Sequence, residues 1–131
     1  MTRRVKSAKI DREHIQPGVY VIQADEDGPV KIGVSSNPER RLAQLQTGNP
    51  ARLVLVAVFL CTTWLIARTL EAAVHLALAP FRLAGEWFRV SPTKACSTIE
   101  EQAARLGYAK DVVRRPRKRN PRRRDDRRRA A

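Results

Sequence analysis

Two short apolar segments joined by a polar loop constrain the fold of this chain more than any other feature. They are VYVIQ at residues 19–23 and VKIGV at residues 30–34, and the loop between them contains Asp-Gly. Apolar segments flanking an Asp-Gly loop are typical of a β-hairpin. A hairpin folded symmetrically about this loop pairs Tyr20 with Gly33 and Ile22 with Lys31. The sequence therefore predicts two antiparallel strands at the start of the folded body.

The two faces of this hairpin differ in character. Successive side chains of a strand point to opposite faces, so the valines and Ile32 form one apolar face. Tyr20, Lys31 and Gly33 fall together on the other. A glycine opposite Tyr20 would leave bare backbone that a phosphate could approach closely, although an isolated glycine in a strand is as often only a bulge site. An ordinary hairpin and the floor of a nucleic-acid site are both consistent with this pattern.

Capping signals predict three helices after the hairpin. Asn37 and Pro38 begin the first helix, which ends at Gly48. Thr63 caps a second helix over residues 64–78, and Ser91 with Pro92 starts a third that stops at Gly107. We expect the second helix to bury a stripe of residues at helical spacing, namely Ile66, Leu70, Ala73 and Ala77. Two further strands are expected, an apolar one at residues 53–61 and a short one within GEWFRV at residues 85–90.

The net charge of +13 lies entirely in two flanking segments. Residues 1–12 carry +4 and residues 114–131 carry +9, whereas residues 13–113 are neutral. We therefore divide the chain into a flexible basic arm (1–12), a folded domain (13–110) and a disordered arginine-rich tail (111–131). Such an excess of positive charge favours a polyanionic partner, with DNA expected and RNA or ribosome association as alternatives. A solubilising extension is the other interpretation of the tail.

Other classes of protein are disfavoured by the sequence. The first residues are polar and basic, which argues against a signal peptide. The longest uncharged run, residues 53–67, is shorter than the ~20 residues that a bilayer-spanning helix needs. Cys61 and Cys96 lie in apolar surroundings without metal-ligand spacing, so we expect buried free thiols in a reducing compartment. These features predict a soluble, cytoplasmic and nucleoid-associated protein of undetermined oligomeric state.

The motifs GVYVI, VKIGVS, NPERRLAQLQTGNP, LEAAVH and GEWF occur in this order over about residues 17–90. In this arrangement the chain resembles the GIY-YIG endonuclease superfamily, and most closely its branch in phages and mobile elements. The resemblance implies an α+β fold with a central three-stranded antiparallel sheet flanked by helices. It also implies hydrolysis of DNA phosphodiester bonds assisted by one divalent metal, Mg²⁺ or Mn²⁺.

The same resemblance suggests roles for individual residues. Tyr20 matches the tyrosine of the first motif, Arg41 the helix arginine, Glu71 the metal-binding glutamate, and His75 a histidine usual in this branch. These residue types suit the chemistry, because a guanidinium stabilises phosphate charge, a phenol beside a metal can accept a proton, and one carboxylate can hold a largely hydrated Mg²⁺. Lys31 stands where most of the superfamily has a second tyrosine, and could contact a phosphate there.

Two departures from the superfamily pattern keep a second function open. One is Lys31, and the other is the lack of a match to an asparagine that many members place after the last strand. Both favour a binding module that keeps the fold without turnover. In either case we expect Gly33 and the basic residues of the tail to contact nucleic acid. The tail residues are Arg114, Arg115, Arg117, Lys118, Arg119, Arg122, Arg123 and Arg124.

Overall fold

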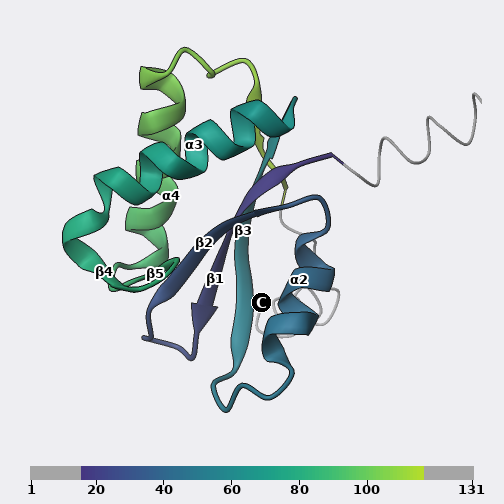
Figure 1. The fold of residues 1–131 in the computed structure, drawn as a ribbon, viewed down its shortest axis with the longest axis vertical. Coiled ribbons are helices and arrows are strands. Elements are labelled where there is room, and N and C mark those ends of the chain that lie inside the picture. The colour runs from purple at the N-terminus through teal and green to yellow at the C-terminus, as the bar shows by residue number, and fades with distance from the viewer. Residues whose placement is uncertain (1–15, 117–131) are drawn as a thin grey trace, which may run out of the picture.

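The computed structural model describes residues 16–116 and shows an α+β domain built on one sheet (Figure 1). Residues 16–116 form three helices, a short 3₁₀ helix and six strands. Their order along the chain is β1 (Gly18–Ala24), β2 (Val30–Ser35), α2 (Pro38–Gln46), β3 (Leu53–Cys61), α3 (Trp64–Ala77), η1 (Ala79–Phe81), β4 (Arg82–Ala84), β5 (Trp87–Phe88), α4 (Pro92–Arg105) and β6 (Val112–Arg114).

The sheet is larger than the sequence predicts. All its strands are antiparallel, in the order β4-β5-β2-β1-β3-β6. The three long strands β2, β1 and β3 form its centre, but the prediction of a three-stranded sheet is wrong, because β4 and β5 extend one edge and β6 extends the other. These additional strands are only two or three residues long. The short strand predicted within GEWFRV is confirmed as β5, whereas β4 and β6 were not predicted, because alternation over three residues leaves no recognisable period in the sequence.

The predicted hairpin register is confirmed. Tyr20 pairs with Gly33 and Ile22 with Lys31. On its other side β1 pairs with β3, where a bulge between Val21 and Ile22 leaves Val56 of β3 as the extra residue. β1 is therefore paired along both edges, and its side chains contribute to the cores on both faces of the sheet.

Helices cover both faces of the sheet, as Figure 1 shows, with α3 and α4 on one side and α2 on the other. The larger core lies under α3 and α4 and contains the apolar face of the hairpin. The smaller core lies under α2. It contains Tyr20, Ile22, Ala24, Leu53 and Val58, with Leu42 and Leu45 of α2 packed against them. The face that carries Tyr20 is therefore buried as well.

The helix starts follow the predicted caps. The side chains of Asn37, Thr63 and Ser91 each accept a hydrogen bond from a backbone N–H in the first turn of α2, α3 and α4. In the predicted stripe of α3, Leu70 is buried and Ile66 packs half-buried against the core. The prediction is wrong at Ala77, which is exposed, and Ala73 is only half-buried, whereas Ala67 and Val74 are buried. The helix α3 carries apolar residues on all its sides, and two of them, Leu65 and Leu76, remain 73% and 78% exposed. Its sequence therefore does not define which side faces the core.

Both cysteines are free and buried, as the sequence predicts. Within residues 16–116, no helix is long and apolar enough to cross a membrane.

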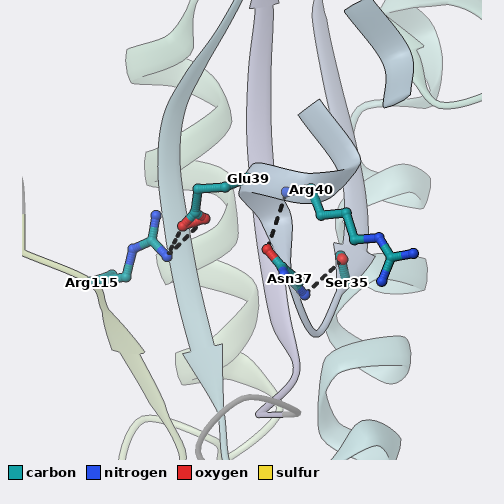
Figure 2. Close-up of polar contacts among 5 residues, drawn as sticks. All are labelled: Ser35, Asn37, Glu39, Arg40 and Arg115. Atoms are coloured by element: carbon teal, nitrogen blue, oxygen red, sulfur yellow. Dashed lines mark hydrogen bonds and ion pairs between the residues drawn. The ribbon is translucent and has the colours of Figure 1, made fainter. Parts of the chain in front are cut away.

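The C-terminal boundary of the fold lies beyond the predicted start of the tail at residue 111. Val112–Arg114 form β6, which pairs with β3, and the Arg115 N–H donates to the Val58 carbonyl oxygen at 2.8 Å. The Arg115 guanidinium also contacts both carboxylate oxygens of Glu39 in α2, at 2.6 and 3.3 Å (Figure 2). The predicted basic arm at 1–12 and the part of the tail from residue 117 onwards lie outside the described residues.

Candidate active site

Tyr20 is seated in the space that Gly33 leaves open. Its side chain projects from β1 across to β2, and a Cβ atom added to Gly33 would lie 2.6 Å from the Tyr20 Cζ and closer still to the hydroxyl oxygen. Tyr20 is only 1% exposed. The phenol ring therefore covers the backbone at Gly33. The prediction of bare backbone for a phosphate at Gly33 does not hold, and this glycine instead makes room for Tyr20.

The charged groups around Tyr20 come from three other parts of the chain. Burial is the main cause that raises the pKa of Tyr20, and the charges of Glu86 and Glu71 raise it further. The Arg41 side chain acts in the opposite direction, through a hydrogen bond and through its charge. The fold thus brings together residues from β1, α2, α3 and the β4–β5 turn, although they are far apart in the sequence.

Arg41 lies in the second turn of α2 and is exposed. Its position follows from the Asn37 cap, whose Oδ1 accepts from the Arg40 N–H at 3.1 Å, and from the bond between the Arg41 N–H and the Asn37 carbonyl oxygen. The Arg41 Nη1 is 3.5 Å from the Gln44 Oε1, a long contact that leaves most of its N–H groups available. Arg41 can therefore present its guanidinium to a phosphate beside Tyr20.

Lys31 is held in place by a residue that the sequence analysis did not select. Its ammonium lies 2.9 Å from the Glu86 Oε2 and 5.9 Å from the centre of the Trp87 ring. Lys31 itself is only 8% exposed. Glu86 belongs to the GEWF motif, which could have pointed to it, although the sequence assigns this glutamate no role. Lys31 is thus a buried lysine paired with a carboxylate.

His75 contacts the backbone of β2. Its Nε2 lies 2.8 Å from the Ile32 carbonyl oxygen, and its ring centre is 5.0 Å from that of Phe88. A carbonyl oxygen can only accept, so Nε2 must carry the proton. On β2, the residues paired with β5 are Val30 and Lys31, so the Ile32 carbonyl group comes just after the last paired residue. His75 therefore attaches α3 to the edge of β2.

Glu71 lies one turn before His75 on α3. Burial is the main cause that raises its pKa, with a further increase from the negative charge of Glu86. The charges of His75, Lys31 and Arg68 lower it. Residues 16–116 contain no group of three or more His, Cys, Asp or Glu side chains that could hold a metal ion. A Mg²⁺ held by Glu71 would then depend on water and substrate oxygens for its other ligands, which suits this ion.

The first two residues of the predicted nucleic-acid-binding tail lie in the folded domain. The Arg114 guanidinium is 5.6 Å from the centre of the Phe59 ring, and Arg115 is engaged by Glu39. Figure 2 shows Arg40 pointing away from this pair. Both tail arginines thus have partners within the domain. The remaining tail residues lie outside the described part of the chain, namely Arg117, Lys118, Arg119, Arg122, Arg123 and Arg124.

These observations define a small α+β domain whose polar cluster joins a buried tyrosine with cationic and acidic side chains. A model of the T5orf172 domain matches residues 18–103, and the chain belongs to this family. The T5orf172 domain is phage-associated and is found in some nuclease-like proteins. The match extends from β1 into α4 and so covers every element of the cluster. The comparison with curated proteins found no match, and the comparison with solved structures found none either.

Proposed function

We propose that this T5orf172 domain is a divalent-metal-dependent endonuclease of the GIY-YIG type that hydrolyses DNA phosphodiester bonds. The observation that carries the proposal is the Tyr20 ring seated over Gly33, where the Arg41 side chain lowers the phenol pKa and the Glu71 charge raises it. A phenol, a guanidinium and a carboxylate are the groups that the resemblance assigns to this reaction. The family match supports a nuclease or nucleic-acid-binding role in general.

Each residue has a distinct role in the proposed reaction. Arg41 binds the non-bridging oxygens of the scissile phosphate and stabilises the charge that develops there. Tyr20 accepts a proton from the attacking water, and the positive charge of Arg41 favours this by lowering the phenol pKa. Glu71 would hold Mg²⁺ or Mn²⁺, which supplies charge stabilisation and acidifies bound water. Lys31 supplies a second cation, and His75 keeps α3 against β2 so that Glu71 stays near the phenol.

The second candidate is a DNA-binding module of the same fold that does not cleave. Two observations favour it. Burial raises the pKa of Tyr20, which opposes loss of its proton, and the Lys31 ammonium is already paired with Glu86. In both candidates DNA is the expected partner, with RNA as the alternative, and the basic terminal segments provide electrostatic attraction that the neutral domain lacks. Association with the nucleoid would follow from DNA binding.

Cleavage of supercoiled plasmid tests the two candidates. Purified protein is incubated with plasmid in Mg²⁺, in Mn²⁺ and in EDTA, alongside the Glu71→Gln variant. An endonuclease nicks the plasmid only with metal, and Glu71→Gln abolishes nicking while leaving DNA affinity nearly unchanged. Glu101→Gln is the matched control, because it makes the same change in charge at an exposed site on α4.

Binding without cleavage in any metal would support the non-cleaving module. Loss of both binding and folding in Glu71→Gln would indicate a structural role for Glu71.

A further inference from the structure

We infer that Glu86 is a positioning residue, whose carboxylate holds the Lys31 ammonium at the candidate site so that the ammonium contacts a phosphate of bound DNA. This inference rests on the proposed function for the identity of the substrate. It concerns a residue that neither the resemblance nor the family match assigns to the site.

Two neighbouring side chains fix the end of Lys31. A free lysine side chain samples many rotamers, and ordering it costs entropy. Here the Glu86 carboxylate attracts the ammonium at 2.9 Å, while the Trp87 ring lies beneath it at 5.9 Å. The lysine side chain is 10% exposed and the glutamate side chain 39%. The charged end of Lys31 is thus held beside a carboxylate that solvent and substrate can reach.

The backbone fixes Glu86 relative to Lys31. Trp87 is the register partner of Lys31, and the Ile32 N–H donates to the Glu86 carbonyl oxygen at 3.1 Å. Gly85, immediately before Glu86, has a φ of 55°, a conformation that side chains disfavour. The turn between β4 and β5 therefore returns the chain so that the Glu86 side chain meets Lys31.

The charges argue for a role beyond packing. The Glu86 charge raises the pKa of both Glu71 and Tyr20, so the carboxylate lies within the polar cluster. Two neighbouring carboxylates repel each other, and Lys31 offsets this repulsion at Glu71, where its charge lowers the pKa. An ammonium has three N–H donors. Lys31 can therefore keep its ion pair with Glu86 and offer an N–H to a phosphate oxygen.

The first test follows Lys31 by nuclear magnetic resonance without any need for cleavage. We expect the Trp87 ring current to shift the Lys31 ε-methylene signals, because the ring centre is 5.9 Å from the ammonium, and Lys31→Met identifies these signals by their disappearance. In Glu86→Gln we expect these signals to move towards those of an exposed lysine, with the rest of the spectrum retained. Glu101→Gln should leave them in place. Unchanged Lys31 signals in folded Glu86→Gln would overturn the inference.

The second test measures plasmid nicking and DNA affinity for Glu86→Gln, Lys31→Met and the double variant. We expect each single substitution to lower the nicking rate at least tenfold, and the double variant to be no slower than Lys31→Met alone, because Glu86 acts through Lys31. Nicking by Glu86→Gln at the rate of the unmodified protein would overturn the inference, as would a double variant much slower than Lys31→Met.

Failure of the proposed function gives a different result. If the unmodified protein binds DNA but never nicks it, the endonuclease proposal fails and DNA affinity becomes the second readout. Equal weakening of affinity by Glu86→Gln and Lys31→Met, together with displaced Lys31 signals, would still support a positioning role. Weakening by Lys31→Met alone would overturn it.

Discussion

Tyr20 combines burial with proximity to charge, and its chemistry depends on the balance of the two. Burial, Glu86 and Glu71 favour the neutral phenol, whereas Arg41 favours the phenolate. Because Gly33 has no side chain, the Tyr20 ring can lie over the backbone of β2, close to these charged groups. Substitutions at Arg41 and at Gly33 therefore change the environment of the phenol in separate ways.

The first prediction concerns the ionisation of Tyr20. The chain has two tyrosines, so Tyr20 can be titrated alone by phenolate absorbance in the Tyr108→Phe background. We expect a pKa above the ordinary value of 10.0, and a still higher pKa in Arg41→Gln, because Arg41 lowers it. The raised pKa stabilises the folded state below pH 10, and this contribution is lost as the pH rises through the folded-state value.

A pKa at or below the ordinary value would contradict this prediction, as would a decrease in Arg41→Gln. Tyr20→Phe supplies the control, because it should remove the Tyr20 contribution to the pH dependence of unfolding.

The second prediction concerns Gly33. A methyl group there would lie 2.6 Å from the Tyr20 Cζ, so Gly33→Ala forces the ring or the strand to move. Overpacking of this kind costs about 1–3 kcal/mol of unfolding free energy. Urea unfolding measures the loss, and we expect loss of nicking as well. In the Tyr20→Leu background the added methyl should cost much less. An equal cost in both backgrounds would show that Tyr20 is not the obstacle.

At the level of elements, α2 links the candidate site to the C-terminal edge of the sheet. Arg41 lies near Tyr20, while Glu39 on the same helix contacts Arg115 just after β6. The second contact involves side chains that are 33% and 49% exposed, so it contributes only about 0–1 kcal/mol. The orientation of α2 therefore depends more on its buried side and its N-terminal cap than on this ion pair.

The third prediction concerns the cap of α2. The Asn37 side chain accepts a hydrogen bond from the Arg40 N–H at 3.1 Å (Figure 2). Asn37 lies one helical turn before Arg41, the residue proposed to bind phosphate. Asn37→Ala should lower the unfolding free energy by about 1 kcal/mol, measured by urea unfolding, whereas Asn37→Asp should retain most of it. Because the cap also orients Arg41, Asn37→Ala should weaken nicking. Equal stability of the alanine and aspartate variants would argue against the capping role.

For the whole molecule, the distribution of charge assigns the attraction of DNA and the proposed reaction to different parts of the chain. The neutral segment 13–113 contains the whole polar cluster, whereas the excess positive charge lies towards the two ends. Interactions between arginines and phosphates provide affinity without sequence specificity. The terminal segments should therefore control binding strength and its salt dependence, while the domain controls what happens to the bound phosphate.

The fourth prediction tests these separate roles in the chain of 131 residues. Substituting Arg122, Arg123 and Arg124 together by glutamine should make the dependence of log affinity on log salt shallower. On duplex DNA the slope should fall by about 0.9 for each phosphate that the variant no longer neutralises. The nicking rate at saturating protein should remain unchanged. Arg105→Gln, in the last turn of α4, serves as the control. An unchanged salt slope would show that these three arginines do not bind DNA.

The sequence by itself determined the local features of this protein. Alternation and the Asp-Gly loop predicted the hairpin register, and capping residues predicted where α2, α3 and α4 begin. These features could be predicted because each depends on interactions within a few residues along the chain. The family match, which covers residues 18–103, agrees with the phage-associated assignment made from the order of the motifs.

The tertiary structure alone decided which distant residues meet. The short strands β4 and β6 exist because neighbouring strands offer them hydrogen-bond partners, and the buried side of α3 depends on the sheet beneath it. The same holds for the ion pair of Lys31 with Glu86 and for the position of the Tyr20 ring above Gly33. Burial and charge proximity are properties of the packed chain, so local spacing in the sequence cannot specify them.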